Sequence, residues 1–166
     1  MADTGAPVLD ADNAAFIMSG VSIAVASSRG DGLPTIVRAW GCRVAADLCE
    51  VTVFVSPAQG DPVLACLRDG RPLAAVFSLP SSHRTIQLKS PVTDIAPCTR
   101  DDRPAIERYI RDFAADLMSI GHDESFTSAY LEFASRDLVR VTFRPAEAFV
   151  QTPGPRAGER LPLTAA

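Results

Sequence analysis

The stretch that decides the fold is HRTIQLK, residues 83–89, which alternates in the way a β-strand does. Side chains of a strand point to its two faces in turn, so Arg84, Ile86 and Leu88 share one face. A guanidinium buried among aliphatic side chains needs an anion or several acceptors, which indicates a phosphate or carboxylate nearby. The alternative is an edge strand whose arginine extends its charged end into water.

Length and composition indicate one folded domain spanning residues 1–166, with flexible ends predicted at 1–13 and 159–166. The net charge of −4 argues against a nucleic-acid groove, which requires a basic surface. No leader pattern and no apolar run of about 20 residues is present, so we expect a cytoplasmic protein without a membrane span. The four cysteines, at positions 42, 49, 66 and 98, lack the close spacing of zinc ligands, and no metal site is predicted.

Hydrophobic periodicity and turn residues predict a mainly β protein with peripheral helices. A long parallel β-α-β alternation is absent, which favours a six-stranded antiparallel barrel. The segment 151–158, rich in proline and glycine, is predicted to be a loop. The predicted strands are 21–27, 34–44, 50–56, 72–79, 84–95 and 138–143, and the predicted helices are 61–69, 103–120 and 124–134.

The candidate chemistry lies in two strands that carry arginine. Arg38 shares a face with Ile36 and Trp40, as Arg84 does with its own aliphatic neighbours. If the barrel brings these strands together, the two guanidiniums can hold one phosphate, and the alternative is two separately solvated arginines. Neutral hydrogen bonds to a ligand can come from Ser56, Gln59, Thr85 and Gln87. No common nucleophile, phosphate-loop or zinc motif is present, so no catalytic residue is named.

Four short motifs in this order carry a resemblance to a known family. They are Pro34-x-x-x-Arg38, the run VFVS at 53–56, HRTIQLK at 83–89 and QTPGP at 151–155. The set resembles the pyridoxamine 5′-phosphate oxidase-like family of FMN-binding split β-barrels. That resemblance implies a homodimer with FMN at the subunit interface. The resemblance and the strand positions together assign ten residues to the cofactor: Arg38, Ala39, Trp40, Val55, Ser56, Gln59, Arg84, Thr85, Gln87 and Lys89. Arg84 and Thr85 would contact the flavin of their own subunit or that of the other subunit.

The chain also departs from the oxidases of that family. Ala58-Gln59-Gly60-Asp61 stands where those enzymes have an Arg-Lys pair for the phosphate, and Thr85 stands where they have glutamine. We therefore expect an FMN-dependent oxidoreductase acting on a small molecule, and not an authentic pyridoxamine phosphate oxidase. A deazaflavin, haem or no cofactor are alternatives. The other functional interpretations are a non-catalytic flavin- or haem-binding carrier or sensor and a ligand-free barrel that acts through its dimer surface.

Overall fold

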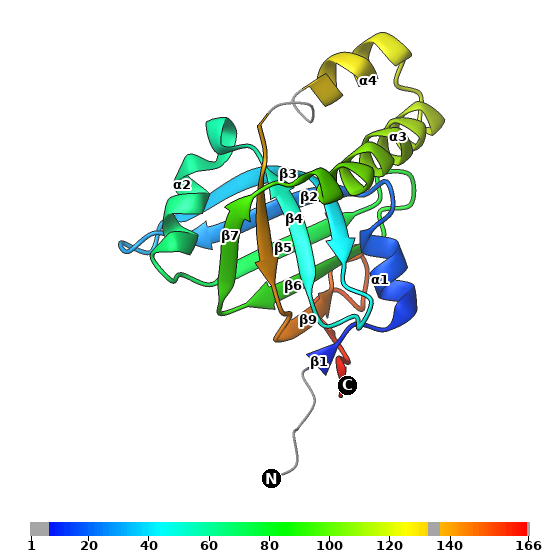
Figure 1. The fold of residues 1–166 in the computed structure, drawn as a ribbon. Coiled ribbons are helices and arrows are strands. Elements are labelled where there is room, and N and C mark those ends of the chain that lie inside the picture. Colours follow the sequence, from blue (N-terminus) through cyan, green and yellow to red (C-terminus); the bar gives the residue numbers. More distant parts are fainter. Residues whose placement is uncertain (1–6, 133–136, 166) are drawn as a thin grey trace.

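The structure is a computed structural model that describes residues 7–132 and 137–165. Figure 1 shows a curled sheet with helices at its sides. In chain order the elements are β1 (Pro7–Val8), α1 (Ala11–Ile17), β2 (Ser22–Ser28), β3 (Pro34–Val44), β4 (Val51–Val55), α2 (Pro57–Arg68), β5 (Leu73–Ser78), β6 (Thr85–Ser90), β7 (Thr93–Pro97), the 3₁₀ turn η1 (Arg100–Asp102), α3 (Arg103–Ser119), α4 (Glu124–Leu131), β8 (Val139–Phe143), β9 (Glu147–Val150), β10 (Arg160–Leu161) and β11 (Thr164–Ala165).

Nine strands of the described chain form one antiparallel sheet in the order β10-β9-β6-β5-β2-β3-β4-β8-β7. The sheet curls into a half-barrel, which confirms the predicted class of a mainly β split barrel with peripheral helices. The count of nine strands differs from the predicted six. One reason is that the predicted strand 84–95 is two strands, β6 and β7, which lie far apart in the sheet because the chain turns at Ser90-Pro91.

The core lies inside the curl of the sheet. Along β2 every second side chain is buried, and Ile23 and Val25 are at most 1% exposed. On β5 Ala75 and Phe77 are fully buried, while the alternate side chains are half-buried on the outer face. All five residues of β4 are buried, and this strand is paired on both sides, with β3 and with β8. The alternating pattern therefore fixes an inner face and an outer face.

Helix α2 begins earlier than predicted. Its N-cap is Ser56 and its first residue is Pro57, whereas the sequence favoured a start at Asp61-Pro62. Proline at the first helical position is favourable because the missing N–H has no partner there in any case. Gly60 allows the helix to pack closely on the sheet, since a Cβ at this position would lie 2.7 Å from Cγ1 of Val55.

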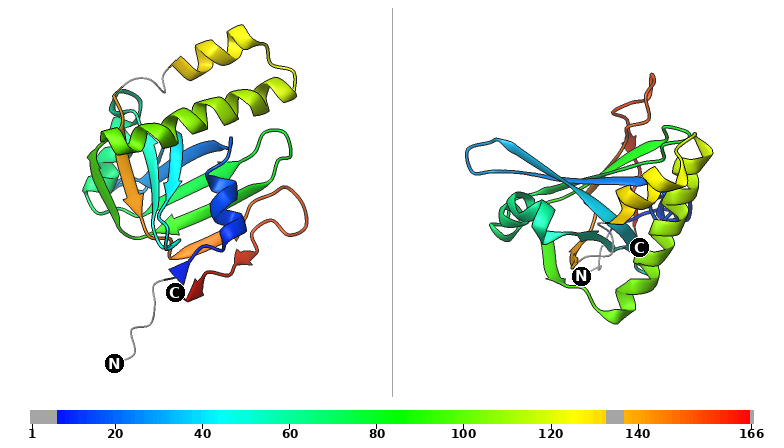
Figure 2. Two further views of the ribbon diagram at one scale, coloured as in Figure 1. Left: turned by 45° about the vertical axis from the view of Figure 1, so that its right-hand side comes forward. Right: turned by 90° about the horizontal axis from the view of Figure 1, so that it is seen from above.

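The outer face of β3 is partly covered by an antiparallel pair of helices, α3 and α4. Gly41 has φ +138°, and a Cβ there would lie 3.4 Å from Cβ of Tyr109 on α3. Figures 1 and 2 show α3 and α4 at the end of the molecule opposite β1. Both helices were predicted from the sequence, although the predicted end of the second, residues 133–134, lies outside the described residues.

Two further features concern the ends of elements. Strand β6 begins at Thr85, because His83 has φ +58° and Arg84 is exposed in the turn before the strand. Residues 7–8 pair with 164–165 in a separate two-stranded sheet. Regular hydrogen bonding therefore extends into both segments for which the sequence predicts flexible ends.

Candidate functional site

The guanidinium of Arg38 lies among three aromatic rings. Its Cζ is 5.0 Å from the ring centroid of Trp40, 4.7 Å from that of Phe113 and 4.8 Å from that of Tyr130. Trp40 is on β3 with Arg38, whereas the other two rings come from α3 and α4. Such contacts between a cation and aromatic faces are favourable by about 0.5–2 kcal/mol each. The rings hold the charge in a fixed place over the outer face of β3, which lies between β2 and β4 in the sheet.

The hydrogen bonds of Arg38 go to hydroxyl groups. Nη1 donates to Ser22 Oγ at 3.3 Å and to Tyr130 Oη at 2.6 Å, and Nη2 donates to Tyr109 Oη at 2.9 Å. Nε is buried and has no partner within the described chain. Burial raises the pKa of the Tyr109 phenol to about 12, an effect that the nearby Arg38 charge opposes. Within the described residues no carboxylate forms an ion pair with Arg38, so its charge can attract an anion.

A cavity of about 340 Å³ opens beside Arg38. Trp40 donates from Nε1 to Gln59 Oε1 at 3.2 Å, which fixes the indole ring at the cavity wall. Gln59 belongs to the first turn of α2, and its backbone N–H is already bonded to the carbonyl of Ser56 at 3.1 Å. The side chains that line the cavity are Val37, Arg38, Trp40, Gln59 and Tyr130. The structure therefore brings three of the predicted site residues together.

Three other predicted residues support this cavity from behind. Ala39 and Val55 are fully buried and face each other across β3 and β4. Ser56 is 2% exposed, and its side chain makes no capping hydrogen bond at the start of α2. These side chains shape the backbone under the cavity and do not line it.

The predicted residues of β6 lie on the same outer face, but two strands, β5 and β2, separate β6 from β3. In register, Gln87 pairs with Val76 of β5, which pairs with Ala24 of β2, which pairs with Arg38. One row further along, Ser78 Oγ and Thr85 Oγ1 are 2.7 Å apart, and Ser78 pairs with Ser22, the residue that accepts from Arg38. Three hydroxyl-bearing residues, Thr85, Ser78 and Ser22, thus occupy paired positions in one row between β6 and Arg38.

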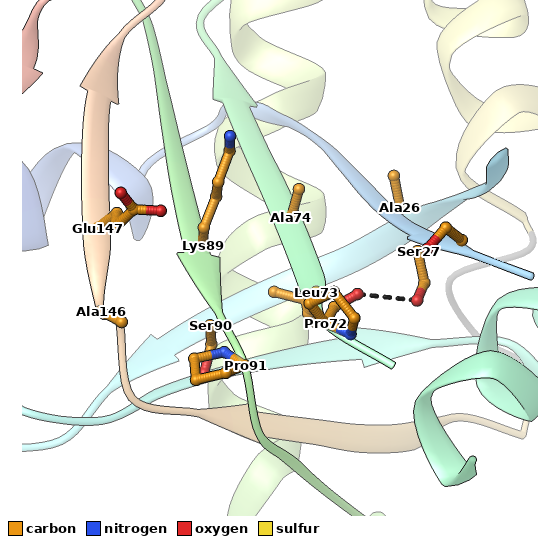
Figure 3. Close-up of a pocket in the computed structure, with 11 residues that line it drawn as sticks. Ala26, Ser27, Pro72, Leu73, Ala74, Lys89, Ser90, Pro91, Ala146 and Glu147 are labelled. Carbon is orange, nitrogen blue, oxygen red and sulfur yellow. Dashed lines mark hydrogen bonds between the residues drawn. The ribbon is translucent and has the colours of Figure 1, made fainter. Parts of the chain in front are cut away.

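Lys89 borders a second and larger cavity of about 520 Å³ on this outer face. Figure 3 shows the side chains of Ala26, Ala74 and Lys89 on the same side of the sheet. The Lys89 ammonium lies 4.9 Å from the centroid of the Phe149 ring. Alanine, proline and leucine side chains make up about half of the residues that line this cavity, so its lining is largely apolar.

Arg84 lies elsewhere. Its Nη2 donates to Asn13 Oδ1 at 3.0 Å, and its Cζ is 4.0 Å from the ring centroid of Phe16, both on α1. Arg38 and Arg84 therefore bind different partners, and within one chain they do not form the phosphate clamp that the sequence suggested. The cause is the exposed turn before β6, which directs Arg84 toward α1.

The sequence analysis did not single out the three residues that complete the surroundings of Arg38. Tyr109, Phe113 and Tyr130 have helical spacing within the predicted helices 103–120 and 124–134, which by itself indicates side chains on the packing faces of two helices. That interpretation is correct for Tyr109 and Phe113, which are 1% and 2% exposed. Tyr130 is 37% exposed, so the packing interpretation holds only in part for this residue, and its contact with Arg38 had no signal in the local pattern. In the part of the chain that is described, no cluster of three or more potential metal ligands occurs.

Comparison with known proteins gives a result for structure only. No family model matches the sequence, and no curated protein matches it. A candidate pyridoxamine 5′-phosphate oxidase from Lactobacillus delbrueckii superposes with a TM-score of 0.53 at 12% identity, over 86% of this chain and 94% of that one. HupZ of Group A Streptococcus superposes with a TM-score of 0.54 at 11% identity, over 90% of this chain and 99% of that one.

An F420 reductase gives a TM-score of 0.52 at 14% identity, over 81% of this chain and 93% of that one. The described residues contain no helix with the length and apolarity needed to cross a membrane. Together with the curled antiparallel sheet, these similarities show that the chain has the split-barrel fold of pyridoxamine 5′-phosphate oxidase-like proteins.

Proposed function

We propose that the protein binds a flavin-type cofactor, FMN in the first place and a deazaflavin as the alternative, and uses it for a redox reaction on a small molecule. The observation that carries this proposal is the Arg38 guanidinium, which has no carboxylate partner in the described chain and lies beside an open cavity with aromatic walls. Solved proteins with this fold include the F420 reductase.

The residues present fit a planar ligand with one anionic group. Trp40 and Tyr130 line the cavity, and the guanidinium of Arg38, whose Nε is buried without a partner in the described chain, carries the charge that an anion would neutralise. Gln59 adds an amide beside them. Neither histidine of the chain lines this cavity, which makes a flavin a better candidate than a haem.

Each residue has a defined task in this proposal. Arg38 binds the anionic group, because it is the one cation among the residues that line the cavity. The hydrogen bond from Trp40 to Gln59 holds both side chains in place, so little conformational entropy is lost when a ring packs against them. A bound flavin supplies hydride or electron transfer, and the protein supplies orientation and exclusion of water.

We also propose that the working unit is a homodimer with the cofactor at the subunit interface. Thr85, Gln87 and Lys89 share the outer face with Arg38 but are separated from it by β2 and β5, so one copy can offer only part of the contacts. Between them the outer face carries small, half-buried side chains, and Ile36 at its edge is 72% exposed. A second copy that covers this face would bring its β6 residues to the flavin of the first.

A non-catalytic carrier or sensor is the second candidate. What favours it is that the residues lining the cavity include no carboxylate and no histidine. Proton transfer to or from a substrate would then depend on water or on the substrate itself. Turnover separates the two functions, since a carrier binds the flavin without passing electrons to an acceptor.

The test is a titration of the purified protein with FMN, followed by flavin fluorescence and visible absorption. We expect saturable binding, and we expect Arg38→Met to weaken it about tenfold or more, because a charged hydrogen bond contributes about 1.5–3 kcal/mol. Arg111→Met is the matched control, since Arg111 is an exposed arginine on α3 paired with Asp112. Unchanged affinity in Arg38→Met refutes the role of Arg38, and sedimentation of a monomer with bound FMN refutes the dimer.

A further inference from the structure

The N–H donors of Arg38 that a ligand would use are already engaged by two helices. Nη1 donates to Tyr130 Oη on α4, Nη2 donates to Tyr109 Oη on α3, and Nε is buried without a partner in the described chain. A phosphate binds best to a pair of N–H donors on one edge of the guanidinium. An anion can therefore reach Arg38 fully only after a phenol oxygen has moved away.

The two phenols differ in how firmly they are held. Tyr109 is 1% exposed and belongs to a helix of 17 residues that packs along β3. Tyr130 is 37% exposed, and its helix, α4, has eight residues of which Thr127 and Leu131 are the buried ones. An isolated helix of this length is unstable in water, so the position of α4 depends on these few contacts. Tyr130 is the oxygen that can leave.

We propose that the Tyr130 hydroxyl is a built-in competitor for the anionic group of the ligand on Arg38, and that α4 is a lid that opens when the anion replaces it. The identity of the ligand rests on the function proposed above, whereas the competition rests on the Arg38–Tyr130 contact. Tyr130 then sets how strongly the site prefers a phosphorylated flavin over an unphosphorylated one.

The connection to α3 suits such a movement. The turn between the helices, residues 120–123, is exposed, and Gly121 in it has φ +100°. Along α4 the ring of Phe126 stacks on those of Tyr130 and His122, with centroids 6.0 Å and 4.8 Å apart. The aromatic side chains of this hairpin can therefore move together. Figure 2 shows α4 against α3 at the end of the molecule.

The first experiment compares FMN with riboflavin, which lacks the phosphate. Dissociation constants are measured for the wild type, for Tyr130→Phe and for Phe126→Leu by flavin fluorescence. We expect Tyr130→Phe to bind FMN about tenfold more tightly, the worth of one charged hydrogen bond, with riboflavin unchanged. Phe126→Leu is the matched control, because it loosens the stack on Tyr130 and leaves the hydroxyl in place.

Two results overturn the proposal in this experiment. One is a ratio of FMN to riboflavin affinity that stays the same or falls in Tyr130→Phe. The other is a rise of that ratio in Phe126→Leu as large as in Tyr130→Phe, which would assign the effect to packing and not to the hydroxyl.

The second experiment uses inorganic phosphate as the probe and needs no flavin. We expect phosphate to increase amide hydrogen exchange in residues 124–131 of the wild type and to change the fluorescence of Trp40, the one tryptophan, whose ring centroid lies 6.2 Å from that of Tyr130. Arg38→Met should abolish both changes. If no flavin binds, the proposed function fails, and this experiment still decides the lid: no phosphate-dependent change in α4 overturns it.

Discussion

Replacing Tyr109 by phenylalanine removes one oxygen atom, and the resulting loss of stability should depend on pH in a specific way. The phenol is 1% exposed and accepts a hydrogen bond from Arg38 at 2.9 Å. At pH 7 its removal leaves an N–H donor of a cation without an acceptor, which costs about 2 kcal/mol of unfolding free energy. The variant should therefore be less stable than the wild type at neutral pH.

Alkaline pH should reduce this difference. Burial raises the pKa of Tyr109 to about 12 in the folded protein, from an ordinary value of 10. Because the unfolded chain loses this proton first, the stability that the neutral phenol provides is complete below pH 10 and disappears as pH rises to 12. At pH 11 the loss amounts to about 1.4 kcal/mol, so the difference from the variant should shrink to about 0.6 kcal/mol.

The assay is urea unfolding followed by far-ultraviolet circular dichroism, under reducing conditions, at several pH values from 7 to 11. Other groups that titrate in this range are shared by both proteins, so the difference between them isolates Tyr109. Phe113→Leu is the control, because this ring stacks on Tyr109 with centroids 5.5 Å apart and has no proton to lose. Its loss of stability should be equal at both ends of the range. An equally constant difference for Tyr109→Phe would refute the reasoning.

Three further predictions concern packing, a buried charge and thiol reactivity. Gly20→Ala should lower the free energy of unfolding in urea by about 1–3 kcal/mol, because the added Cβ would clash with the backbone carbonyl oxygen of Asp112. Gly30→Ala is the control and should be near neutral, because the added Cβ meets only the flexible end of the Arg71 side chain. Asp102→Asn should cost about 2 kcal/mol by the same assay, since this fully buried carboxylate lies between two arginines of β3 and β8. A thiol reagent at pH 8 should label the native protein at Cys98 alone, because the other three thiols are buried, and mass spectrometry of the labelled protein checks this. The labelling should be slow, because burial raises the pKa of Cys98 to about 11 and little thiolate is present at pH 8.

Local patterns explain most of what could be predicted of the fold. Alternation of side chains marked β2, β3 and β4 to within one residue, and helical periodicity marked α3. The start of α2 was wrong because two Xaa-Pro pairs offered equivalent helix starts, and only the close approach of Gly60 to Val55 decides between them. β9 was not predicted because a strand of four residues gives too short a pattern.

Of the candidate site, the sequence by itself determined the members that are neighbours along the chain. Arg38 and Trp40 alternate on β3, and Gln59 follows the next strand by a few residues, so their proximity is local. Only the tertiary structure decided that Tyr130, 92 positions away, contacts Arg38. It also decided that Arg84 turns to α1. The physical reason is that the strand period fixes the face a side chain occupies, whereas the partner it meets depends on how strands are ordered and how helices pack.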